Sequence, residues 1–135
     1  MKILNFFTIL CLSFFMIGTV HAQKGNPKIR ALKIEVVTGE MNLTKDQEAR
    51  FLPIYNRYSD ELLNLYHAKK KVDAKANGME SVNERQRIDQ QILDVKKKYK
   101  DDFLKIISPS QLSNMYKGEE KFKALLINRL KDHNE

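Results

Sequence analysis

Apolar residues recur every three or four positions along most of the chain, which is the period of an amphipathic α-helix. The pattern divides into four helical segments, over residues 28–41, 45–76, 82–106 and 109–131. The connections between them are short, and no segment alternates like a convincing strand. Short connections make consecutive helices antiparallel neighbours. The sequence therefore predicts an all-α fold of four helices.

Three of these helices are expected to begin at a capping box. In this motif a Ser or Thr caps the helix, and a Glu or Gln three residues later bonds back to the backbone N–H of the cap. The boxes are Thr44–Gln47, Ser81–Glu84 and Ser108–Gln111. Pro109 follows the third cap at the first helical position, where a missing N–H costs nothing. The boxes thus mark the expected starts of the second, third and fourth helices.

Each expected helix carries one apolar face. In chain order the faces are Ile29, Leu32, Val36 and Val37; Phe51, Tyr55, Tyr58, Leu62, Leu65 and Val72; Ile88, Ile92, Val95, Tyr99, Phe103 and Ile106; and Leu112, Met115, Phe122, Leu126 and Leu130. Gly118 interrupts the last helix, at an expected cost of about 1 kcal/mol in an exposed helix interior.

The second helix is expected to be long for a chain of this size. Residues 45–76 would span roughly 48 Å as a helix, whereas a compact globule of this length has a radius of gyration of about 13 Å. We therefore expect a thin, elongated layer of helices. Such a layer leaves one face open unless a second copy, a client protein or both cover it.

Residues 1–22 have the organisation of a secretory signal peptide. Lys2 supplies a positive start, residues 3–20 carry no charge, and Ala22 offers a small residue at the cleavage position. The apolar run is short for a membrane span and lacks the flanking charge of a stop-transfer segment. The sequence therefore predicts cleavage and export to the periplasm.

Removal of this segment changes the composition. Of 135 residues 113 would remain, and the net charge would fall from +7 to +6 because Lys2 is lost. The single cysteine, Cys11, would also be lost, and Leu10 before it is not the small residue of a lipoprotein signal. Disulfide scaffolds, thiol catalysis and iron–sulfur chemistry are thereby excluded. The remainder is expected to form a flexible leader over residues 23–27 and one domain over residues 28–135.

Candidate catalytic chemistry is sparse in this sequence. Outside the expected signal peptide the histidines are His67 and His133, which cannot form a zinc-binding pair four residues apart. No glycine-rich phosphate loop or nucleophile elbow is present. Adjacent carboxylates such as Asp101 and Asp102 do not face each other on a helix. The sequence predicts a protein that is not an enzyme and uses no metal or cofactor.

Two runs of lysine are the strongest charge feature. The second helix ends with Lys69, Lys70 and Lys71, and the third helix carries Lys96, Lys97, Lys98 and Lys100. Antiparallel pairing could bring the runs to similar heights, as a positive stripe that attracts anionic partners. The alternative is a solvated surface whose lysine stems cover apolar flanks. Nucleic acid is not an expected partner of an exported protein.

The tyrosines fall mostly on the apolar faces, where core packing is the default interpretation. On an open concave face, Tyr58, Tyr66 and Tyr99 could instead offer amphipathic rings for adaptable binding. These three tyrosines and the lysines of the two runs are therefore the candidate client-binding residues.

Two of the capping boxes share a longer form. Leu43 to Gln47 reads L-T-x-x-Q in full, and Ile107 to Gln111 is a degenerate second copy. With the expected signal peptide and a basic helical chain, these motifs resemble the periplasmic Spy/CpxP family. The longer pattern A-L-K-I…L-T-x-x-Q-x-x-x-F-x-P-x-Y-N-x-Y is similar to the Bacteroidetes branch of that group.

The resemblance implies a bent helical hairpin that dimerises into an antiparallel cradle. It also implies an ATP-independent chaperone or a modulator of envelope-stress signalling. The motif residues would be structural and would cap helices and fix the hairpin ends; they are Leu43, Thr44, Gln47, Ile107, Ser108 and Gln111. The His-rich signature of the metal-binding relatives is missing from this sequence.

We therefore expect an exported, non-enzymatic helical protein that shields apolar segments of unfolded or envelope proteins. It is expected to be a homodimer, with at most peripheral membrane association. One alternative is a regulatory or sensor subunit of an envelope-stress or sigma-factor signalling system. Another is a periplasmic metal-handling protein.

Overall fold

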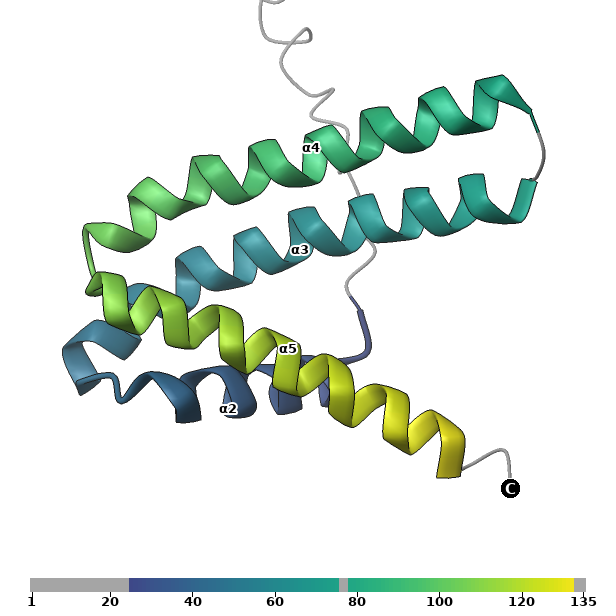
Figure 1. Cartoon of the computed structure of the whole chain (residues 1–135). Helices are drawn as coiled ribbons and strands as arrows, with labels where there is room; N and C mark the ends of the chain where they lie inside the picture. Colours follow the sequence, from purple (N-terminus) through teal and green to yellow (C-terminus); the bar gives the residue numbers. More distant parts are fainter. Residues whose placement is uncertain (1–24, 76–77, 133–135) are drawn as a thin grey trace, which may run out of the picture.

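The computed structural model describes residues 25–75 and 78–132, and Figure 1 shows their arrangement. Within these ranges the chain forms four α-helices and no strand: α2 (Pro27–Met41), α3 (Lys45–Lys75), α4 (Met79–Leu104) and α5 (Pro109–Asp132). The all-α prediction is thus confirmed. The expected signal peptide lies outside the described residues.

Local hydrogen bonds explain where α2 begins and ends. The side-chain oxygen of Asn26 accepts the backbone N–H of Lys28 at 3.0 Å, and Pro27 occupies the first turn. Asn42 follows the helix in the left-handed conformation, with φ of 51°, as is common at helix C-termini. The expected leader therefore extends one residue too far, because Pro27 already belongs to α2.

α3 and α4 lie side by side and run in opposite directions (Figure 1). Near the ends formed by residues 75 and 79, Arg85 pairs with Asp73 at 3.1 Å. Further along the pair, the hydroxyl of Tyr99 donates to the carboxylate of Glu61. These contacts show the register of the pair. The same register determines where the two lysine runs lie relative to each other.

α2 and α5 form the second antiparallel pair, and Gly118 lets them approach closely (Figure 1). A Cβ atom at position 118 would lie 2.8 Å from the Cα of Val37 and 3.3 Å from its carbonyl oxygen. Gly118 is buried, so the prediction of an exposed helix interior at this residue is wrong. The missing side chain makes room for the α2 backbone.

The core lies between the two helix pairs and is built around an aromatic cluster. Its rings are those of Phe51, Tyr55, Tyr58, Tyr99 and Phe103, each at most 5% exposed. The rings of Tyr58 and Phe103 meet edge to face with centroids 5.4 Å apart, a favoured aromatic geometry. Residues of all four helices join this core. The expected single thin layer is therefore wrong, because α2 and α5 fold back over α3 and α4.

Both connections between the pairs lie at the same end of the molecule (Figure 1). Residues 42–44 join α2 to α3, and residues 105–108 join α4 to α5. We call this the closed end. Toward the opposite end, which we call the open end, α5 diverges from α3 (Figure 1).

Candidate functional site

Two of the three expected capping boxes are confirmed, and both lie at the closed end. The backbone N–H of Thr44 donates to the side-chain oxygen of Gln47, and the N–H of Gln47 donates to the Thr44 hydroxyl, each at 3.1 Å. Ser108 and Gln111 make the same reciprocal bonds at 3.0 and 3.1 Å. The two motifs therefore start α3 and α5 in the same way.

The expected box at Ser81 is wrong. α4 begins at Met79, and Gly78 occupies the capping position without a side-chain bond. Ser81 therefore lies inside the first turn. Met and Glu are good helix formers, and Glu80 also suits the positive N-terminal end of the helix dipole. Both residues extend the helix past the local capping signal.

The glutamines of the two confirmed boxes also bind each other. Each amide nitrogen donates to the other side-chain oxygen at 3.0 Å, so that Gln47 and Gln111 form a reciprocal amide pair. The second N–H of Gln47 reaches the carbonyl of Ile106 at 3.2 Å, and that of Gln111 reaches the carbonyl of Asn42 at 3.4 Å. This amide pair joins the two helix pairs across the closed end.

The apolar residues that precede the boxes support this junction. Ile107 is 3% exposed and belongs to the core, and Leu43 packs against the core from the equivalent position. The structure thus brings together the motif residues of both copies. Their expected structural role agrees with this arrangement.

Substitution of both glutamines tests the junction. We expect Gln47→Ala and Gln111→Ala each to lower the free energy of unfolding by about 1–2 kcal/mol, because partly buried partners lose hydrogen bonds. The double variant should cost less than the two changes together, by about 0.5–3 kcal/mol. Urea unfolding measures all three. Gln90→Ala, which removes one exposed bond to Asp94, is the control and should change little; strict additivity would contradict the pair.

Beyond the closed end, the carboxylate of Glu119 on α5 links three helices. It accepts hydrogen bonds from the hydroxyls of Tyr55 at 3.2 Å and Tyr58 at 3.4 Å, both on α3. The ammonium group of Lys33 on α2 lies 4.0 Å away. Burial raises the pKa of Glu119, and the charge of Lys33 opposes this rise. Glu119 is thus a largely buried acid with partners on two other helices.

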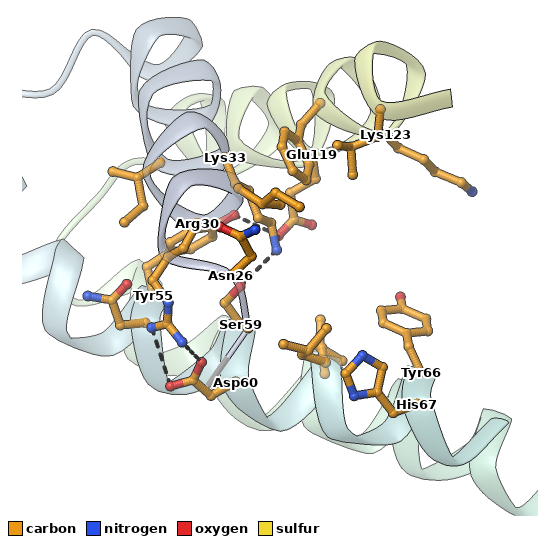
Figure 2. A pocket seen from close by; sticks show the side chains of 18 of the residues that line it. Asn26, Arg30, Lys33, Tyr55, Ser59, Asp60, Tyr66, His67, Glu119 and Lys123 are labelled. Carbon is orange, nitrogen blue, oxygen red and sulfur yellow. Dashed lines mark hydrogen bonds and ion pairs between the residues drawn. The ribbon is translucent and has the colours of Figure 1, made fainter. Parts of the chain in front are cut away.

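Lys33 is held in a similar way. Its nitrogen donates to the hydroxyl of Ser59 at 2.8 Å and lies 5.5 Å from the ring centroid of Tyr55. Burial lowers the pKa of Lys33, and Glu119 opposes this. Nearby, the guanidinium of Arg30 pairs with the carboxylate of Asp60 (Figure 2). These residues form a polar cluster that ties α2 and α5 to α3: Arg30, Lys33, Tyr55, Tyr58, Ser59, Asp60 and Glu119.

The tyrosines of this cluster predict a loss of stability in alkali. Burial, followed by the charge of Glu119, raises the pKa of both Tyr55 and Tyr58. Since a raised pKa keeps the folded form protonated, each tyrosine's contribution is complete below pH 10 and is lost as the pH rises further. At pH 11 each of these two tyrosines should lower the free energy of unfolding by about 1.4 kcal/mol.

Urea unfolding at pH 9 and pH 11 measures this loss. Tyr58→Phe should reduce the alkaline loss by about 1.4 kcal/mol, because one ionisable hydroxyl is gone. Tyr99, whose pKa is raised to about 12, adds to the loss in both proteins. An alkaline loss that is the same in Tyr58→Phe as in the unchanged protein would contradict the buried position of this hydroxyl.

A cleft of about 740 Å³ lies beside the polar cluster, toward the open end. Its apolar wall includes Ile29 of α2, Leu63 and Tyr66 of α3, and Leu126 of α5, and α4 contributes Lys96. Ile29 is 44% exposed and Tyr66 is 47% exposed. A volume of this size falls in the range of ligand-binding pockets. The cleft is therefore the candidate functional site.

Figure 2 shows how the labelled side chains are distributed around the cleft. Arg30, Lys33 and Glu119 gather at its inner end, where the polar cluster closes it. Tyr66 and His67 project from α3 further out, and the side chain of Lys123 points away from Glu119 (Figure 2). The arrangement can accommodate an apolar group and attract a negative charge at the outer end.

The predicted lysine stripe is not formed. Lys69 of the first run pairs with Asp89, whereas Lys98 of the second run lies 3.4 Å from Glu61. Lys69 therefore lies opposite Asp89, and Lys96 lies seven residues, or about 10 Å, further along α4. The prediction of similar heights is wrong, because the pairing of α3 with α4 places Lys69 beside Asp89 rather than beside the second lysine run.

Only some of the lysines of the two runs line the cleft. Lys69 and Lys96 line it. The other lysines of the two runs lie outside its lining; they are Lys70, Lys71, Lys97, Lys98 and Lys100. Binding of clients by any of them stays a prediction.

The candidate tyrosines are also divided. Tyr58 is fully buried and Tyr99 is 5% exposed, so their expected contact with a client is wrong for this structure. Both rings face the core, where they meet at a centroid distance of 5.5 Å. Tyr66 alone of the three lies on the cleft and remains a candidate.

Sequence reasoning missed Glu119 and Lys33 as parts of a site. Glu119 stands four residues after Met115 and three before Phe122, which places a carboxylate on the apolar stripe of α5. Lys33 stands four residues before the buried Val37 in the same way. A charged residue on an apolar stripe is the signal that could have found both.

Within residues 25–75 and 78–132, no group of three or more His, Cys, Asp or Glu side chains is placed to hold a metal ion. None of the helices in these ranges has the length and apolar character that a membrane crossing needs.

No protein-family model matches the sequence, and no curated protein or solved structure is significantly similar to it. The function of the chain is therefore inferred from its own residues.

Proposed function

We propose that this chain is an exported, non-enzymatic helical binding protein that holds apolar segments of other proteins. It would act as an ATP-independent chaperone or envelope-stress protein of the Spy/CpxP type. The observation that carries the proposal is the cleft, whose apolar wall is open at its mouth. Exposed apolar patches of this kind mark interaction sites.

The cleft itself carries exposed apolar side chains. Ile29 and Tyr66, 44% and 47% exposed, lie at its mouth, and Leu126 of α5 also lines it. A client segment could place several apolar side chains along this surface, each gaining about 25 cal/mol per Å² buried. Several small, dispersed contacts favour weak and reversible binding rather than one high-affinity contact.

Charge supports the same proposal. The chain carries a net charge of +7, and Lys69, Lys96 and Lys123 line the cleft. A positive surface raises the encounter rate with negatively charged chains more than it raises final affinity. We further propose a homodimer, in which two clefts would offer a longer surface, as the resemblance implies.

Light scattering by an aggregating client protein tests the function. We expect scattering to fall as the ratio of this protein to client rises. Ile29→Asp with Tyr66→Asp should remove most of the effect, because both changes place charge at the mouth. Leu93→Asp with Leu104→Asp is the matched control, since these α4 residues are 46% and 37% exposed and lie outside the cleft lining.

Two results would contradict the proposal. One is no suppression of scattering at a several-fold molar excess of the protein. The other is an equal loss of suppression in both double variants. A pull-down that returns one dominant stoichiometric partner would favour a regulatory subunit instead.

A further inference from the structure

We propose that the interior of the cleft binds a single-chain anionic amphiphile, meaning one hydrocarbon chain with one acidic headgroup. A free fatty acid and a lysophospholipid share this chemistry. The site lies inside the cleft, whereas the proposed protein clients lie along its mouth. The inference thus goes beyond the proposed function and does not depend on it.

The shape and lining of the cleft fit a hydrocarbon chain. Its volume of about 740 Å³ is that of a small-molecule site. Leu62 and Leu63 line it from α3, and Phe122 and Leu126 line it from α5. The polar cluster lies to one side of these apolar residues, so that the hydrocarbon chain would lie between α3 and α5.

The charges that line the cleft favour an acidic headgroup. The lining includes five lysines and arginines against three carboxylates. Two of the carboxylates already have cationic partners, because Asp60 pairs with Arg30 and Glu119 lies 4.0 Å from Lys33. A cationic ligand would therefore find Asp60 and Glu119 already paired with Arg30 and Lys33.

Lys96 and Lys123 provide the complementary positions for an anion. Both line the cleft, and neither forms an ion pair within the described part of the chain. Lys96 is half-buried and Lys123 is exposed. The side chain of Lys123 points away from Glu119 (Figure 2). The headgroup would therefore lie beside these two ammonium groups, about one turn of α5 beyond Glu119, in contact with water.

Titration with a fluorescent fatty acid, 11-(dansylamino)undecanoic acid, tests the site below the micelle concentration. We expect saturable binding of one probe per chain, with a blue shift as the dansyl group leaves water. Palmitate and lysophosphatidylglycerol should both displace the probe, and the one that acts at lower concentration identifies the preferred headgroup. Neutral monoolein and cationic dodecyltrimethylammonium should displace it poorly.

Two pairs of variants locate the binding. Leu126→Asp, and separately Lys96→Glu with Lys123→Glu, should each weaken probe binding at least about tenfold, or 1.4 kcal/mol. The matched controls are Leu93→Asp and Lys97→Glu with Lys117→Glu, which lie outside the cleft lining. Lys123 is exposed, so Lys123→Glu alone tests the site even where the other changes unfold the protein.

The proposal is overturned by the absence of saturable binding. It is also overturned if neutral and cationic amphiphiles displace the probe as well as palmitate does, or if the controls weaken binding as much as the cleft variants. Probe binding needs no client protein. A chain that binds the probe but does not suppress aggregation would therefore contradict the proposed function and support the amphiphile site.

Discussion

Gly118→Ala is expected to destabilise the protein by about 2–3 kcal/mol, although alanine is the better helix former. The new methyl group would meet the Cα of Val37 at 2.8 Å and its carbonyl oxygen at 3.3 Å. Both contacts are to backbone atoms, so no side chain can rotate away. The α2–α5 pair would have to separate, which would open the core beneath it. Chemical denaturation measures the loss.

Gly39→Ala is the matched control for this prediction. Gly39 also lies inside a helix of the α2–α5 pair, but a Cβ there meets no atom within 4 Å. The same substitution should therefore stabilise the protein by about 0.5–1 kcal/mol. Effects of the same sign at both glycines would refute the close helix approach at Gly118.

Glu119→Ala is expected to cost about 2–4 kcal/mol. The change removes the acceptor for the hydroxyls of Tyr55 and Tyr58 and leaves the partly buried ammonium of Lys33 without its carboxylate. Thermal or urea unfolding gives the size of the loss. Glu120→Ala, at the exposed neighbouring position, should change stability by less than about 0.5 kcal/mol.

A second substitution shows whether the buried charge is the cause. Lys33→Met in the Glu119→Ala background removes the unpaired ammonium and should recover about 1–2 kcal/mol, because an uncompensated buried charge costs more than an apolar group of similar size. No recovery would mean that the tyrosine hydroxyls, rather than Lys33, carry the loss.

Capping motifs predict helix starts correctly where the bonds that form them join residues only three positions apart. The boxes at Thr44 and Ser108 depend on bonds between residues three apart, and both form as expected. The start of α3 at Lys45 agrees with its box. Ser81 carries the same signature but does not cap, because helix formation extends back to Met79. A capping motif thus marks a residue at which a helix can begin, but the helix can also begin at an earlier residue.

Tertiary contacts account for the failures. The period of α5 identifies its apolar stripe, but nothing in that stripe says that the Val37 backbone lies against Gly118. The length of α3 was predicted well, yet the thin layer was not found, because α2 and α5 return over the aromatic core. Glu119 shows the same limit: its place on the stripe is visible, while its partners on α2 and α3 are fixed only by packing.

The most direct test of client binding at the cleft is site-specific photo-crosslinking. A photoreactive phenylalanine analogue replaces Tyr66 in one variant and Leu93 in another, two positions that are 47% and 46% exposed. Each variant is illuminated with the same unfolded client protein, and the crosslinked product is quantified. Binding at the cleft predicts strong crosslinking from position 66 and little from position 93. Equal yields from both positions, or a higher yield from position 93, would contradict it.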